Sequence, residues 1–80
     1  MEIQQLRYVL ALARERNFSR AAGNLFITQP TLSQQLKKTE AELGFPLFVR
    51  STRSVDLTER GAEFVRRAEG VVAAFDELQG

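Results

Sequence analysis

Apolar and polar residues at the start of the chain alternate with the period of an amphipathic helix. Over residues 3–16 the apolar side chains recur three or four positions apart, which predicts a helix with one buried face. The segment Asn17-Phe18-Ser19 interrupts the pattern. Ser19 is suited to cap a short second helix over residues 20–26, whose inner face carries two small alanines.

A third helix is predicted from about Pro30 to Leu43. Proline is tolerated in the first turn because its missing N–H would have no helical partner there, and Thr28 can cap the helix. Gly44 is suited to its C-terminal end, and Pro46 prevents the helix from restarting. The predicted buried stripe consists of Leu32, Leu36 and Leu43.

The pattern changes to short β-capable runs after the third helix. Residues 47–49 and 55–57 are rich in apolar side chains, and the polar, basic residues 50–54 separate them. This arrangement predicts a small hairpin with an exposed basic tip. Neither Asn-Gly nor Asp-Gly occurs in the segment, so the sequence leaves the turn type open.

A long last helix is predicted over residues 59–79, with Thr58 as its cap. Its apolar residues recur with the spacing of a coiled-coil seam, which consists of Phe64, Ala68, Val71, Phe75 and Leu78, with Val65 and Val72 beside it. The first of these would cover the chain's own core. From Val71 onward the sequence offers no further element to pack on, so the exposed stripe predicts a homodimer through this helix.

Composition narrows the chemistry that the chain can perform. Its 80 residues, 44% of them hydrophobic, fit one small globular domain. The absence of cysteine and histidine excludes disulfides, thiolate metal sites and the commonest general base. The carboxylates are not clustered, so we do not expect an enzyme. No apolar run reaches the ~20 residues of a membrane span, and the N-terminus does not resemble a signal peptide, so we expect a cytoplasmic protein.

Charge is unevenly distributed although the net charge is only +1. Residues 16–54 contain six Lys or Arg against two Glu, whereas residues 55–80 contain three Arg against six acidic residues. A basic middle favours an anionic partner. On charge alone, an unevenly charged solvated surface explains the pattern equally well.

Two helices joined by a short turn, the second with a polar outer face, are typical of a helix-turn-helix that binds DNA. Gln29 and Gln34 each carry a donor and an acceptor suited to adenine, and Lys37 can reach guanine or a phosphate. A hairpin tip with Arg50 and Arg53 can follow the backbone or enter a narrow minor groove. Taken singly, each of these residues is more often a solvated surface residue.

Several groups of residues occur together in a fixed order. They are Phe18-Ser19-Arg20-Ala21-Ala22, Leu25, Thr28-Gln29-Pro30-Thr31-Leu32-Ser33, Glu40, Leu43-Gly44, Leu47-Phe48, Arg50, Arg53 and Leu57-Thr58-Glu59-Arg60-Gly61. Over about residues 1–61 the chain thereby resembles the N-terminal domain of LysR-type transcriptional regulators.

The resemblance implies a mainly α fold with a small β-hairpin. A winged helix-turn-helix is expected over residues 1–58, with the helix-turn-helix at about 18–37 and the wing at about 47–57, followed by a dimerising linker helix over residues 59–80. The effector-sensing C-terminal domain of the family is absent from these 80 residues. We therefore expect no cofactor here, and a small-molecule effector on that missing domain.

The resemblance also assigns roles to single residues. It implies major-groove contacts by Gln29, Pro30, Thr31, Ser33 and Gln34. It implies Arg53 in the minor groove, phosphates beside Arg50, Ser51 and Thr52, and backbone contacts by Ser19 and Arg20.

The chain departs from the family pattern at two positions. Position 34 is commonly arginine in the family, so glutamine should lower affinity for phosphate or guanine. Thr39 replaces a usual leucine on the buried stripe, so packing there is looser or its hydroxyl bonds to the carbonyl of Gln35.

The predicted function is sequence-specific binding of double-stranded DNA by a bacterial regulator at the nucleoid. A symmetric dimer would recognise an inverted repeat, and the full-length protein would form a tetramer. The alternative is a protein-interaction module whose function is the heptad helix. A steep salt dependence of DNA affinity would distinguish the two.

Overall fold

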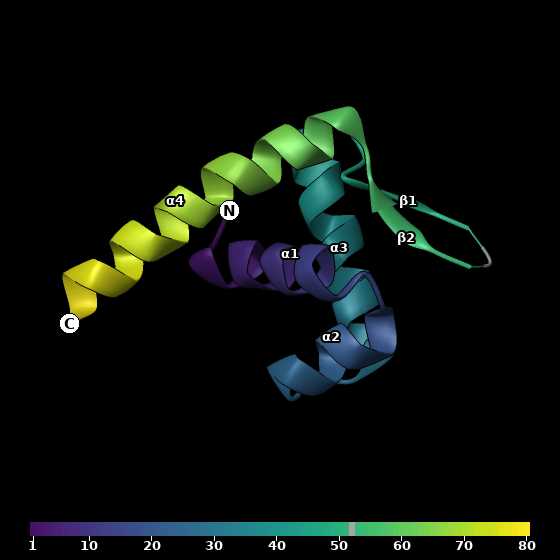
Figure 1. Cartoon of the computed structure of the whole chain (residues 1–80), viewed down its shortest axis with the longest axis horizontal. Helices are drawn as coiled ribbons and strands as arrows, with labels where there is room; N and C mark the ends of the chain where they lie inside the picture. The colour runs from purple at the N-terminus through teal and green to yellow at the C-terminus, as the bar shows by residue number, and fades with distance from the viewer. Residues whose placement is uncertain (52) are drawn as a thin grey trace.

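The computed structural model describes residues 1–51 and 53–80, which form four helices and one hairpin (Figure 1). The elements are α1 (Ile3–Glu15), α2 (Phe18–Leu25), α3 (Gln29–Leu43), β1 (Phe48–Arg50), β2 (Val55–Leu57) and α4 (Glu59–Gln79). This order confirms the predicted mainly α fold with a winged helix-turn-helix and a long last helix. Among the described residues, no helix is both long and apolar enough to cross a membrane.

The core lies between α1, α2 and α3 and extends to the base of the hairpin. Its buried members are Val9, Leu12, Ala21, Ala22, Leu32, Leu36, Leu47 and Phe48. Phe64 and Val65 of α4 pack against this cluster from outside, as expected from their place at the start of the seam. Burial of these side chains fixes how α3 is rolled about its axis, and therefore which of its residues face solvent.

The predicted ends of the later helices are confirmed because each depends on one local interaction. Thr28 Oγ1 accepts a hydrogen bond from Thr31 N–H at 3.3 Å, and Thr58 Oγ1 accepts one from Gly61 N–H at 2.8 Å. Gly44 ends α3 with a φ of 84°, the left-handed conformation that glycine adopts without strain.

The predicted start of α2 is wrong. Asn17, not Ser19, is the cap: its Oδ1 accepts from Arg20 N–H at 2.8 Å, so the helix begins two residues earlier. Ser19 is therefore helical, and its hydroxyl is available for another contact. Phe26, which was expected in the helix, ends it in a left-handed conformation with its side chain 95% exposed.

The antiparallel hairpin pairs Phe48 with Leu57 and Arg50 with Val55. The first strand is shifted by one residue from the expected 47–49: the ladder starts with the pair Phe48 and Leu57, and the fully buried Leu47 precedes it. Glu40 holds the base of the hairpin, since its Oε2 accepts from Leu47 N–H at 2.6 Å and from Phe48 N–H at 3.2 Å.

The hairpin and α4 diverge from a tight joint (Figure 1). The Leu47 carbonyl accepts from Thr58 N–H at 2.9 Å. A Cβ on Gly61 would lie 2.1 Å from that same carbonyl oxygen, so only glycine fits here without displacing the backbone. Ala68 further along α4 is buried within the chain.

The far half of α4 contacts α1, contrary to the expectation that it has nothing to pack on. Arg7 Nη1 donates to Asp76 Oδ2 at 3.3 Å, and the guanidinium lies 5.9 Å from the centre of the Phe75 ring. A second bond joins Arg7 Nη2 to Asp76 Oδ1, and the two hydrogen bonds lower the pKa of Asp76. Val71 and Leu78 nevertheless remain 52% and 84% exposed.

Thr39 is buried in α3, and its hydroxyl donates to the Gln35 carbonyl at 3.0 Å, the second of the two arrangements considered for it. The same oxygen accepts from Gln5 Nε2 at 3.0 Å. Gln5 also donates to Glu42 Oε1 at 2.6 Å, and this bond lowers the pKa of Glu42. A polar network that joins α1 to α3 thus takes the place of a leucine.

Candidate nucleic-acid interface

The outer face of α3 presents a polar surface on a rigid support. Leu32 and Leu36 are buried on the opposite side of the helix. The predicted major-groove residues Gln29, Pro30, Thr31, Gln34 and Lys37 are all exposed. Side chains of this kind can hydrogen-bond base edges and phosphates when a helix enters the major groove.

The first turn of α3 is oriented by a contact from α2. Ser19 Oγ donates to Gln29 Oε1 at 2.9 Å, so one of the two lone pairs of this oxygen is used and the side chain is oriented. The amide Nε2 group remains to donate. Thr31 is oriented similarly, because its Oγ1 accepts from Thr28 Oγ1 at 2.9 Å. The sequence predicted Ser19 and Gln29 as separate DNA contacts and did not predict that they bond to each other.

Arg50 connects the wing to both helices of the helix-turn-helix. Its Nη2 donates to Ser33 Oγ at 3.1 Å, and its guanidinium lies 4.2 Å from the centre of the Phe18 ring. Ser33 is accordingly half-buried beside the wing. Arg50 therefore supports the wing in the free protein, a role that residue type alone could not indicate.

The wing tip is closed by a serine hydroxyl. Ser51 Oγ accepts from Arg53 N–H at 3.3 Å and from Ser54 N–H at 3.1 Å, so this hydroxyl serves the turn rather than solvent. The Arg53 side chain is exposed, as predicted. Thr52, which was predicted beside a phosphate, lies outside the described residues.

A shallow groove of about 250 Å³ separates the wing tip from the helix-turn-helix. It is lined by Asn17, Phe18, Ser19 and Gln29 on one side and by Ser51, Arg53, Ser54 and Val55 on the other. The fold thus brings predicted contacts from three separate segments around one concave surface. Arg20 lies next to Ser19 on α2 and is exposed, and its guanidinium pairs with Glu15 at 3.5 Å.

The predicted dimerisation residues divide into two groups. Phe64 packs against the core and Ala68 is buried, so both serve the chain's own packing. Val72 lines a groove with Arg7 and other residues of α1 and α2, and Phe75 is half-buried. Val71 and Leu78 are the exposed members of the seam.

A family model described as the bacterial regulatory helix-turn-helix protein, lysR family, matches residues 3–62. The regulator BudR of Klebsiella aerogenes is 54% identical over 76 residues, which cover 95% of this chain and 53% of BudR. The chain spans about a quarter of several other curated relatives, which are likewise described as transcriptional regulators.

Solved structures of DNA-binding domains with bound DNA superimpose closely. The BenM domain on its benA site 1 DNA has a TM-score of 0.94 and 38% identity, over 98% of this chain and 88% of that one. The CbnR domain in complex with DNA has a TM-score of 0.94 and 34% identity, over 99% and 91% of the two chains.

Proposed function

The chain belongs to the LysR family of bacterial helix-turn-helix regulators and has the fold of their DNA-binding domains, and we propose that it recognises a specific sequence in double-stranded DNA. The observation that carries the proposal is the groove between the exposed N-terminal turn of α3 and the basic wing tip. A helix and a cationic hairpin on either side of one concave surface fit the two grooves of a duplex.

In the major groove we assign base reading to the first two turns of α3. Gln29, oriented by the bond from Ser19, offers its amide N–H groups to acceptors such as guanine O6 and N7 or thymine O4. Its oxygen keeps a second lone pair for a donor such as adenine N6. Gln34 is exposed one turn later and retains both a donor and an acceptor. Lys37 follows on the same face as a phosphate contact.

In the minor groove we place the wing tip, with the exposed Arg53 as its inserting side chain. The turn closed by Ser51 is compact, which suits a narrow groove of enhanced negative potential. Arg50, already bound to Ser33 and stacked on Phe18, keeps remaining N–H groups for the adjacent backbone phosphates.

We further propose that the chain dimerises through the far half of α4 and binds an inverted repeat. The support is the pair of exposed apolar residues Val71 and Leu78, two turns apart on one flank of the helix. A two-fold pair of such helices would place two α3 helices on half-sites about one turn of DNA, or a multiple of it, apart.

Sedimentation over a range of concentrations tests the dimer. Val71→Asp with Leu78→Asp should give a folded monomer that binds an inverted repeat without cooperativity, because both positions are exposed within the chain. Ala73→Asp, exposed and on the opposite side of α4, adds one of these two negative charges away from the stripe and should leave the dimer intact. A wild-type chain that stays monomeric at high concentration would contradict the assignment.

For the whole protein we propose an effector-responsive bacterial regulator in the cytoplasm and nucleoid, with a tetramer as its assembled form and no catalytic activity. The support is that curated relatives of greater length are transcriptional regulators. In this proposal the small-molecule effector binds outside these 80 residues.

Selection of binding sites from random duplex DNA tests the central proposal. An enriched inverted repeat, bound with an affinity that falls steeply with salt, is the expected result. A pool with no enriched sequence, or an affinity insensitive to salt, would instead favour a protein-interaction module built on α4.

A further inference from the structure

The outer half of the wing depends on contacts with the rest of the chain for its position. Two strands of three residues each form a ribbon that is marginal on its own in water. The base is fixed by the buried Phe48 and by the two backbone N–H groups that donate to Glu40. Further out, Arg50 contacts Ser33 and Phe18, and the half-buried Val55 packs against the core. The tip, which carries Arg53, lies beyond these contacts.

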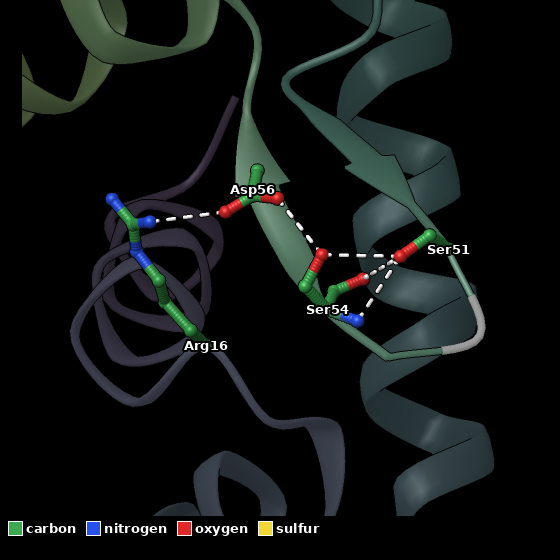
Figure 2. A network of polar contacts seen from close by, with 4 residues as sticks. All are labelled: Arg16, Ser51, Ser54 and Asp56. Carbon is green, nitrogen blue, oxygen red and sulfur yellow. Dashed lines mark hydrogen bonds and ion pairs between the residues drawn. The ribbon is translucent and has the colours of Figure 1, made fainter.

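A chain of polar contacts joins this outer half to the end of α1 (Figure 2). Arg16 Nη1 donates to Asp56 Oδ1 on β2 at 3.1 Å, and Ser54 Oγ donates to Asp56 Oδ2 at 2.9 Å. Ser54 Oγ also lies 3.1 Å from Ser51 Oγ, the hydroxyl that closes the tip. One carboxylate thus holds α1 with one oxygen and the wing tip with the other.

The backbone at Arg16 does not itself favour arginine. With φ 53° and ψ 31° it caps α1 in the left-handed conformation, where glycine is the common residue and a Cβ is disfavoured. Glycine would satisfy this backbone, so what arginine adds is its side chain. Figure 2 shows that side chain directed at Asp56.

We propose that Arg16 is a positioning residue for DNA binding: its ion pair with Asp56 fixes the wing tip and thereby the approach of Arg53 to the duplex. The inference rests on the proposed function of the wing. The pair also neutralises a carboxylate that lies on the same hairpin as Arg53 and would otherwise repel the phosphate backbone.

The test is a double-mutant cycle of Arg16→Gly and Asp56→Asn, read as the affinity of the chain for its selected DNA site. We expect Arg16→Gly to weaken binding about two- to five-fold in the wild-type background, the scale of one exposed ion pair. In the Asp56→Asn background it should have no effect. Equal losses in both backgrounds would overturn the proposal, because a direct phosphate contact by Arg16 does not need Asp56.

Matched variants distinguish loss of the ion pair from loss of one positive charge and from loss of stability. Arg16→Lys can keep the pair and should retain most of the affinity, whereas Arg66→Ala removes the same charge from a pair within α4 and should cost less than Arg16→Gly. The Tm of Arg16→Gly should be unchanged or higher, because glycine suits the left-handed position. A weaker binder that is no less stable is not explained by unfolding.

Hydrogen exchange in the free chain examines the contact without DNA. The Ser51 and Ser54 amides, bonded across the turn, should exchange faster in Arg16→Gly than in wild type. Unchanged exchange would overturn the inference.

If Arg53→Ala weakens binding and Arg16→Gly does not, this inference alone fails. If Arg53→Ala itself has no effect, the proposed function of the wing fails.

Discussion

The recognition helix α3 and the wing both present polar side chains to the same groove, but they are held in opposite ways. α3 is held from behind by Leu32, Leu36 and Thr39, all buried, and its outer face is exposed. Beyond its base, the wing is held by surface contacts of Arg50 and Asp56 with neighbouring elements and by the half-buried Val55. One surface is therefore positioned by full burial and the other mainly by exposed polar bonds.

This difference separates mutations that change the stability of the fold from mutations that change DNA affinity. Burial contributes about 1.5–3 kcal/mol per large apolar side chain, so the orientation of α3 cannot change without partial unfolding. Exposed polar contacts contribute about 1 kcal/mol or less each, so the wing can change position while the core stays intact. Mutations behind α3 should act on folding, whereas mutations in the wing should act on DNA affinity.

The largest expected effect is at the buried side of α3. Leu36→Ala should lower the free energy of unfolding by about 2–5 kcal/mol, because it leaves a cavity in the core. Urea denaturation measures this, with the exposed Lys38→Ala as control. A loss of DNA affinity without loss of stability in Leu36→Ala would contradict the role of burial.

Arg53→Ala at the wing should lower DNA affinity and leave the stability of the fold nearly unchanged. We expect a loss of about 1–3 kcal/mol in DNA binding and a smaller salt slope, because the side chain is exposed and meets the groove only in the complex. The Tm should stay within a degree or two of wild type, on the order expected of a surface change. Unaltered affinity in the folded variant would remove Arg53 from the interface.

Within α3 itself, Gln29 and Lys37 should separate reading from anchoring. Gln29→Ala should relax preference at one operator position by about 1–3 kcal/mol, whereas Lys37→Ala should weaken all sequences alike. Ser19→Ala, which removes the bond that orients Gln29, should alter the preference at that same position. Selection of binding sites with each variant measures these preferences. If Gln29→Ala and Ser19→Ala also lower the affinity for all sequences equally, then Gln29 does not read a base.

The smallest effect concerns the far half of α4, which α1 holds, as it does the wing, through a surface ion pair. Because Arg7 lowers the pKa of Asp76, the pair stabilises the fold above the ordinary pKa near 3.8 and is lost as the pH falls through the lowered value. The difference in Tm between wild type and Asp76→Asn should therefore be present at pH 7 and shrink at pH 3. A difference that persists at pH 3 would exclude this linkage.

Features that depend on one or two neighbouring residues could be predicted from the sequence. The caps Thr28 and Thr58 and the terminating Gly44 each satisfy backbone groups within a single turn, so their residue types indicate the helix ends directly. At the start of α2 this logic was insufficient, because both Asn17 and Ser19 are good caps. The backbone conformation at Asn17, and not its residue type, decides between them.

Contacts between distant segments could not be predicted in this way. Gln5 and Thr39 are 34 positions apart and bond in the core. Arg50 and Ser33 were each assigned to DNA by resemblance, yet they bond to each other in the free chain. The resemblance assigned each side chain to DNA, but which of them pair with each other depends on how the wing packs beside α2 and α3.

The joint at Leu47 and Gly61 gives the molecule a mechanical property. The base of the wing and the first turn of α4 share one carbonyl and have no room to slide, so they turn together. With its 21 residues, α4 is a lever about 30 Å long, and a tilt of roughly 6° moves its free end by about 3 Å. We therefore expect a tilt of the helix to be passed on to the base of the hairpin through this joint.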